Sequence, residues 1–183
     1  MMRGLRKLEL TLAILKPDVV AHPNILKEIR SIILQQEFFF VRSKKLILSP
    51  TRANEFYKEH EGKFFLNRLV SFMSSGPIWT HILARENAIP EWRRIMGPTK
   101  VLKTIHEAPE TIRGRFGLTD TRNCTHGSDS PETAAREINF FFPEFSTDRW
   151  HDTEGAHFYN GQVAFDEDLC QHVALQHVSD SIS

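Results

Sequence analysis

The alternation of hydrophobic and polar side chains changes its period several times along the chain. Residues 8–15 begin with alternating positions and end in a continuous apolar run, which is typical of a strand entering a core. Residues 38–48 are rich in aromatic and branched side chains, and residues 78–84 form another apolar run, so both predict strands. Between the first two, apolar side chains recur at helical spacing after Pro23 and predict a helix.

Further helices are predicted where a start signal precedes a helical period. They lie at residues 51–60, from residue 64 to the Gly-Pro pair at 76–77, at residues 86–96, and from Ser130 onward. The intervening residues 97–129 show little periodicity and are rich in glycine, threonine and charge. A stretch of this length without periodic structure is usually functional or disordered. We place a fourth strand within it, at residues 115–119.

Strands that alternate with helices predict an α/β or α+β sandwich. The 183 residues suffice for one domain with a sizeable core. We assign residues 8–150 to this domain and residues 1–7 to a short basic tail. After residue 151 the pattern decays, and residues 151–183 are interpreted as an extension that is partly disordered or docked on the domain.

Composition narrows the class of protein. The chain is 40% hydrophobic and 25% charged, as in ordinary globular proteins, and no apolar run approaches the ~20 residues of a membrane-spanning helix. Lys plus Arg equals Asp plus Glu, at 23 each, so no nucleic-acid partner is expected. Cys124 and Cys170 lack metal-site spacing and predict two reduced thiols. The basic start fits either a mitochondrial address or a short disordered tail.

Side chains that could bind a ligand or react with it are concentrated in residues 113–130. Three arginines, Asn123 and His126 lie in this one segment, and Gly127 beside the histidine leaves room for a close approach. Arginine recognises phosphate through its planar fork, and a neutral imidazole can act as a nucleophile. Spacing alone nevertheless favours a turn-rich surface loop with a solvated histidine, because short motifs produce false positives.

Four segments in order resemble the nucleoside diphosphate kinase family, specifically a divergent branch of it. They are Ile14-Leu15-Lys16-Pro17-Asp18, Ser75-Gly76-Pro77, Thr111-Ile112-Arg113-Gly114-Arg115-Phe116 and Asn123-Cys124-Thr125-His126-Gly127-Ser128-Asp129-Ser130. The resemblance covers residues 10–145 and implies a ferredoxin-like sandwich, a four-stranded antiparallel sheet covered by helices. It also implies ping-pong transfer of the γ-phosphate of ATP to nucleoside diphosphates through a phosphohistidine. The implied cofactor is Mg²⁺, bound through the nucleotide phosphates without a direct protein ligand.

The resemblance also implies a catalytic set. His126 would be the phosphorylated nucleophile, Lys16 would lie at the transferred phosphate, and Tyr57 would hydrogen-bond near both. Glu137 would orient His126, and Ser128 completes the set. Glu137 shares a helix face with Ser130, so both are expected to turn toward His126. Taken alone, Glu137 is equally a solvated helix acid and Tyr57 a core tyrosine.

The implied nucleotide-binding side chains come from several segments. They are Lys16, Phe64, Arg93, Thr99, Arg113 and Asn123. Phe64 would stack on the base with Leu69 nearby, although both also fit plain helix core. Arg93, Thr99 and Arg113 would grip phosphates, and Asn123 would reach the sugar. Arg93 and Arg94 are adjacent on one helix, so only one of them is expected to face the site.

Two of three departures from the common family pattern argue against the usual hexamer, although self-association stays possible, and the third, Asp120, predicts a lower nucleotide affinity. Residues 100–110 are longer than usual in a loop used for oligomer contacts, Asp120 replaces an apolar residue beside the base, and the tail from residue 153 is unrelated. The leading hypothesis is an active kinase that binds ATP and nucleoside diphosphates, with mitochondrial localisation favoured over cytoplasmic. The alternative is a weakly active or inactive member that acts as a nucleotide- or protein-binding module, with a possible protein partner.

Overall fold

The computed structural model describes residues 7–175. Most of the predicted basic tail, residues 1–6, lies outside this range, as do residues 176–183 of the predicted extension. Within the described range, every helix is too short or too polar to cross a membrane.

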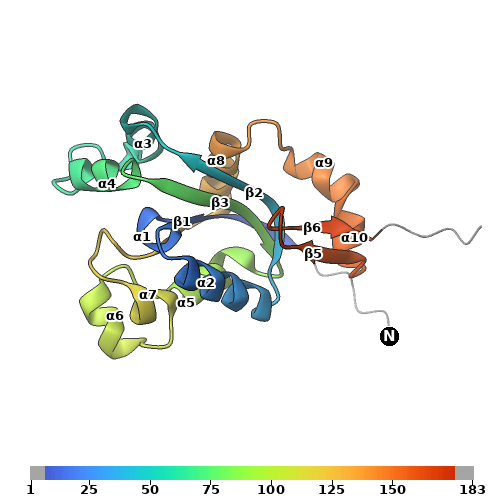
Figure 1. Cartoon of the computed structure of the whole chain (residues 1–183). Helices are drawn as coiled ribbons and strands as arrows, with labels where there is room; N and C mark the ends of the chain where they lie inside the picture. The colour runs from blue at the N-terminus through green and yellow to red at the C-terminus, as the bar shows by residue number, and fades with distance from the viewer. Residues whose placement is uncertain (1–6, 176–183) are drawn as a thin grey trace, which may run out of the picture.

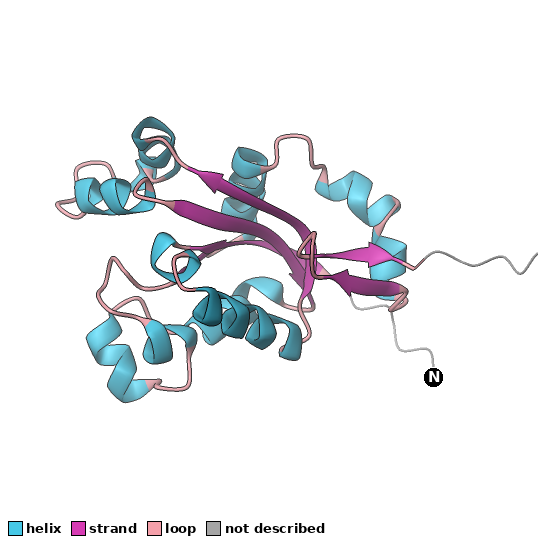
Figure 2. Ribbon diagram, viewed as in Figure 1, coloured by secondary structure: helices cyan, strands magenta, loops and turns pink. Residues whose placement is uncertain are grey.

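The centre of the molecule is a four-stranded antiparallel sheet in the order β2-β3-β1-β4 (Figure 2). Its strands are β1 (Glu9–Leu15), β2 (Phe39–Ile47), β3 (Pro77–Arg85) and β4 (Thr125–Gly127). In register, Ile14 of β1 lies between Thr80 of β3 and His126 of β4. The predicted four-stranded antiparallel sheet is therefore confirmed.

Each face of the sheet carries its own hydrophobic cluster. Alternate residues of β1 point to opposite faces, so Leu12 and Ile14 pack into one cluster while Ala13 and Leu15 pack into the other. Helices α3 (Pro50–Phe56), α4 (Leu66–Met73) and α8 (Pro131–Phe141) lie on the first face. Helices α2 (Pro23–Gln35) and α5 (Ala88–Met96) cover the second (Figure 1). The shorter helices are α1 (Pro17–Val20), η1 (Lys58–His60), α6 (Val101–Glu107) and α7 (Ile112–Phe116).

The predicted position of the fourth strand is wrong. Residues 115–119 end α7 and continue as loop, whereas the fourth strand is β4, which begins at Thr125. α7 begins where the Thr111 side chain caps the Gly114 amide. β4 has three residues, too few to show an alternation, and it exists because β1 offers it a partner. The stretch from 97 to 129 is thus two short helices and a strand rather than one long loop.

The C-terminal segment folds against the sheet as far as residue 175. Its elements are α9 (Thr147–Asp152), α10 (Gly155–Tyr159), β5 (Val163–Asp166) and β6 (Gln171–Ala174), so α9 crosses the boundary expected at residue 150. Trp150 joins the cluster on the α8 face, and Cys170 joins the cluster on the α2 face. The Leu8 amide donates to the Tyr159 hydroxyl at 3.1 Å, and the Phe40 amide donates to Nδ1 of His172 at 2.9 Å. The segment therefore straddles the outer strand β2 and contributes to both clusters.

Candidate active site

His126 is fixed at its place on β4 from two directions. Its backbone pairs with Ile14 of β1, and its carbonyl accepts a hydrogen bond from Nε1 of Trp92 on α5 at 3.2 Å. A Cβ added at Gly127 would lie 2.5 Å from Cδ1 of Trp92, so only glycine allows this close packing of β4 on α5. The position of the imidazole is consequently set by core packing rather than by a mobile loop.

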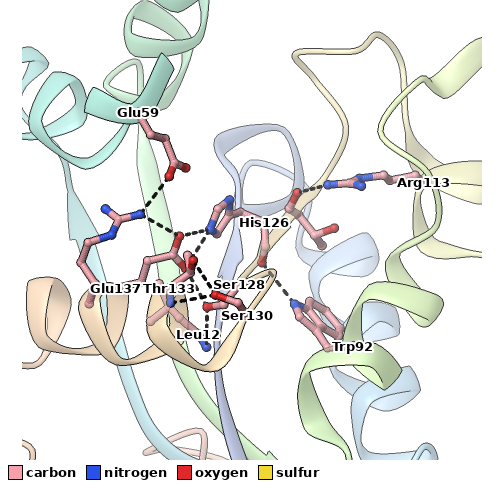
Figure 3. A network of polar contacts seen from close by, with 11 residues as sticks. Leu12, Glu59, Trp92, Arg113, His126, Ser128, Ser130, Thr133 and Glu137 are labelled. Carbon is pink, nitrogen blue, oxygen red and sulfur yellow. Dashed lines mark hydrogen bonds and ion pairs between the residues drawn. The ribbon is translucent and has the colours of Figure 1, made fainter. Parts of the chain in front are cut away.

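The imidazole of His126 is held by a buried carboxylate (Figure 3). Nε2 lies 3.0 Å from both Oε1 and Oε2 of Glu137, whose side chain is 1% exposed. The Ser128 hydroxyl donates to Oε2 of Glu137 at 2.7 Å and itself accepts from the Leu12 amide at 3.3 Å. Because a carboxylate accepts, the hydrogen of a neutral His126 sits on Nε2, and the lone pair sits on Nδ1.

Two predicted contacts of this cluster do not form. Ser130 caps α8 instead of turning toward His126: its Oγ accepts from the Thr133 amide at 3.1 Å and lies 2.9 Å from Oγ1 of Thr133. The Tyr57 ring meets the His126 ring edge-on at 6.1 Å, but its buried hydroxyl has no hydrogen-bond partner among the described residues. Burial, reinforced by Glu137, raises the pKa of Tyr57 well above its usual value. Lys16, the predicted partner of this hydroxyl, donates to Asn123 instead.

Lys16 follows β1 and is almost completely buried, at 5% exposure. Its Nζ donates to Oδ1 of Asn123 at 2.6 Å, and its amide donates to the Cys124 carbonyl at 2.9 Å. Burial, assisted by the nearby Arg113 guanidinium, lowers the pKa of Lys16 to about 7. The ammonium is thus held in a dry position where an added negative charge would favour its protonated form.

Arg113 braces the segment that carries the site. Its guanidinium donates to three backbone carbonyls, those of Asn123 at 3.2 Å, Gly97 at 2.8 Å and Thr125 at 2.8 Å. Burial lowers the pKa of Arg113 to about 10, so it stays charged at neutral pH. A guanidinium has five N–H groups, and three bonds leave two for a ligand.

A cavity of about 650 Å³ opens in front of His126, which is a size suited to a small-molecule ligand. It is lined by nine of the ten predicted site residues: Lys16, Tyr57, Phe64, Arg93, Thr99, Arg113, Asn123, His126 and Glu137. The tenth, Ser128, reaches the site through its bond to Glu137. Arg94 instead pairs with Glu91 at 3.0 Å, so one arginine of the adjacent pair faces the cavity.

The rim and walls of the cavity include two predicted apolar residues and two cations that the sequence did not single out. Phe64 is 91% exposed at the cavity, unlike a core residue of a helix, and Leu69 also lines it. Arg68 and Lys100 add two cations to the lining. Nothing in their spacing distinguishes these two from solvated charges, so the sequence offered no signal for them.

The sequence and the fold both have known relatives. Residues 9–147 match the family model described as nucleoside diphosphate kinase. The chain belongs to the nucleoside diphosphate kinase family. It is 53% identical over 167 residues to nucleoside diphosphate kinase 6 of Danio rerio, which covers 91% of this chain and 95% of that protein. It is 51% identical over 164 residues to nucleoside diphosphate kinase 6 of Homo sapiens, with 90% and 88% covered.

Solved structures of the family share the fold. The nucleoside diphosphate kinase of Aquifex aeolicus superposes with a TM-score of 0.71 at 39% identity, covering 77% of this chain and 97% of that chain. The enzyme from Halobacterium salinarum, solved in complex with CDP, gives a TM-score of 0.68 at 34% identity, covering 73% and 87%. The ferredoxin-like fold expected from the resemblance is confirmed.

Asp120 distinguishes this nucleoside diphosphate kinase family member from the common pattern. Its Oδ1 accepts from the Val101 amide at 2.9 Å, and its carbonyl accepts from Nδ2 of Asn123 at 2.9 Å. The carboxylate therefore caps α6 at the cavity wall. The backbone carbonyl of the same residue holds Asn123, which in turn holds Lys16. A polar residue at this position has a structural task that an apolar one does not.

The acidic side chains near the site do not form a metal cage among the described residues. Among residues 7–175, no three His, Cys, Asp or Glu side chains come together in a metal-binding group. Asp120 and Asp129 are separate carboxylates on the cavity wall. A magnesium ion that keeps its waters and binds through substrate phosphates needs only one or two carboxylates, so this lining fits such an ion.

Proposed function

We propose that this chain is an active nucleoside diphosphate kinase that carries the γ-phosphate of ATP to nucleoside diphosphates on His126. The observation that carries the proposal is the bond from Nε2 of His126 to the buried Glu137, because it leaves the lone pair of Nδ1 for a phosphoryl group. The family membership supports the same reaction.

The cations of the cavity suit a polyphosphate ligand. Lys16, Arg93 and Arg113 line the cavity together with Arg68 and Lys100, and an anionic ligand would be held by several of them at once. A phosphate beside Lys16 would favour its ammonium form, so nucleotide binding above pH 7 is expected to take up a proton. Thr99 would hydrogen-bond a phosphate, Asn123 would reach the sugar, and the exposed Phe64 would stack on the base.

The transfer is two in-line displacements. Nδ1 of His126 would form a bond to the γ-phosphorus while the bond to the bridging oxygen breaks, and the electron pair leaves on the diphosphate. A terminal oxygen of a second diphosphate would then form a bond to the phosphorus while the bond between phosphorus and Nδ1 breaks. The electron pair of that bond returns to Nδ1 of His126 as its lone pair. Glu137, oriented by Ser128, would stabilise the Nε2–H of the ring as positive charge develops during attack. Tyr57 would restrict the ring by its edge contact.

Magnesium belongs to the proposal as a partner of the nucleotide phosphates. When bound, it would neutralise phosphate charge and align the chain of phosphates. Asp120 and Asp129 can accept hydrogen bonds from its water ligands.

A labelling experiment tests the proposal. Full-length protein is mixed with γ-labelled ATP and Mg²⁺, and an acid-labile, base-stable phosphoprotein is expected that loses its label on addition of a nucleoside diphosphate. His126→Asn should remove the label, and the exposed His106→Asn should keep it. Nucleotide binding without label in the folded wild type would instead support the alternative, a nucleotide-binding module.

The proposal also predicts a broad substrate range. Stacking on Phe64 acts on every base, because every base has a π-face. Steady-state rates with several diphosphates are expected to agree within about tenfold, since stacking strength varies only modestly among bases. Rates that differ by orders of magnitude would contradict it.

A further inference from the structure

One guanidinium connects the buried Glu137 to the far side of the cavity. Arg136 precedes Glu137 on α8, and its Nη2 lies 3.2 Å from Oε2 of Glu59 and 3.8 Å from Oε1 of Glu137. Glu59 belongs to η1 and lines the cavity. Figure 3 shows Glu59, Glu137 and His126 as neighbours in this network.

Glu137 needs such a cation more than a surface carboxylate does. At 1% exposure it has little water to stabilise its charge, and its other partners, the Ser128 hydroxyl and a neutral His126, are dipoles rather than charges. Among the described residues, Arg136 is the one arginine or lysine that forms an ion pair with it. Its charge therefore attracts the carboxylate that accepts from Nε2 and helps to hold it in place.

Glu59 draws the same guanidinium toward the cavity mouth. η1 directly follows Tyr57 and leads into the turn that carries Phe64. The Arg136–Glu59 pair is half exposed on both sides, at 48% each, so water and salt screen it and it can open and close. Arg136 thus contacts two carboxylates. One is the buried Glu137 beside His126, and the other is the exposed Glu59 of η1, which leads into the turn that carries Phe64.

We infer that Arg136 is a positioning residue for phosphoryl transfer: it holds the Glu137 carboxylate against His126, and it links this pair through Glu59 to the turn that carries Phe64. The inference rests on the proposed function. Loss of Arg136 should slow transfer to His126 more than it weakens nucleotide binding. Loss of the Glu59 charge should leave transfer intact, because the guanidinium then remains with Glu137 alone.

Rapid-quench kinetics of the full-length protein separate these effects. The rate of phosphohistidine formation is measured against ATP concentration, which gives a limiting rate and a half-saturation concentration. Arg136→Met is expected to lower the limiting rate roughly tenfold, as does loss of other groups that orient a reacting residue, with a smaller change in half-saturation. Arg136→Lys should recover most of the rate because it keeps the charge, and Glu59→Gln should retain it.

The matched control is Arg52→Met, since Arg52 is also 48% exposed and pairs with a surface glutamate on α3. It should leave the limiting rate unchanged. An unchanged rate in Arg136→Met, an equal loss in Arg52→Met, or no recovery in Arg136→Lys would overturn the inference. If Arg136→Met does not fold, Arg136→Gln takes its place under the same criteria.

A spectroscopic measurement keeps this test separate from the proposed function. A wild type that forms no phosphohistidine would defeat the proposed function, but the ¹⁵N spectrum of His126 still reports which ring nitrogen carries the hydrogen. Arg136→Met is expected to reduce the Nε2–H signal, and Arg136→Lys to restore it. An identical spectrum in all three proteins would overturn the inference independently.

Discussion

Two histidines on the two strands that flank β1 have opposite surroundings. His126 of β4 lies at the edge of a cavity, 19% exposed, with Nε2 against a buried carboxylate. His81 of β3 is fully buried, stacked on Trp79, with Nδ1 2.7 Å from Oγ of Ser43. Burial lowers the pKa of His81 to about 3, so this ring stays neutral inside the core. The comparison shows that an imidazole becomes a candidate nucleophile through its acceptor and its access to a cavity.

The hydrogen-bond partner of each imidazole determines what the ring can do. The Ser43 hydroxyl donates to the Cys170 carbonyl, so it can only accept from Nδ1–H of His81. That leaves His81 as a donor within the core, where it fastens the C-terminal segment to β3 through Ser43. Glu137 also accepts from a ring N–H, that of Nε2 of His126, but its negative charge stabilises any positive charge that the ring acquires.

The largest expected effect separates the two histidines directly. His126→Asn should lower phosphohistidine formation by a factor on the order of 10⁴ or more, since a nucleophile has no substitute. His81→Asn should keep the rate per folded molecule and lose stability instead. Quench kinetics and thermal melts of both variants measure this, and a large rate loss in His81→Asn would break the distinction.

Removal of the Glu137 carboxylate should make His126 a much less effective nucleophile. Glu137→Gln is expected to slow phosphorylation roughly 10²-fold, because a neutral amide does not stabilise charge on the ring. Glu132→Gln, an exposed acid on the same helix, is the control. Equal rates in the two variants would mean that the contact between Nε2 and Glu137 does not contribute to the phosphorylation rate.

Acid should unfold the protein partly through His81. The unfolded ring binds a proton below a pKa of about 6.5, whereas the folded ring does so only near 3, so stability is present above 6.5 and is lost as pH falls toward 3. The contribution is at most about 1.4 kcal/mol per pH unit. Urea unfolding at several pH values between these limits should show a shallower pH slope in His81→Phe than in wild type. Identical slopes would contradict the assignment.

The smallest expected effect concerns the partner of His81. Ser43→Ala leaves a buried N–H and the Cys170 carbonyl without their shared hydroxyl, which should cost about 1–2 kcal/mol of unfolding free energy. Phosphorylation should not change, because Ser43 does not line the cavity. Urea unfolding and quench kinetics of the same preparation measure both quantities.

The sequence predicted the parts of the fold that carry a period. β1, β2 and β3 were predicted within one or two residues because long runs of apolar side chains reveal them. β4 was misplaced because its three residues are defined by pairing with β1, and α6 and α7 were missed because short helices gain their stability from tertiary contacts. The decaying pattern after residue 151 concealed a hairpin that is anchored by single residues such as His172.

The candidate site was predicted through its motif residues, and its network was not. Motif positions identified His126, Lys16 and Arg113, which the structure brings around one cavity, although their roles remain predictions. The bond from Lys16 to Asn123 and the carbonyl bonds of Arg113 depend on how the chain from 97 to 129 folds back. Side-chain identity gives no information on such distances.

The C-terminal hairpin has a consequence for how copies of this chain can meet. β2 is the outer strand of the sheet, and outer strands invite another strand to join them. At the start of β2 the Phe40 amide is already engaged by His172, so that amide is unavailable to an incoming chain. A strand that joined β2 at Phe40 would first have to displace His172 from this amide.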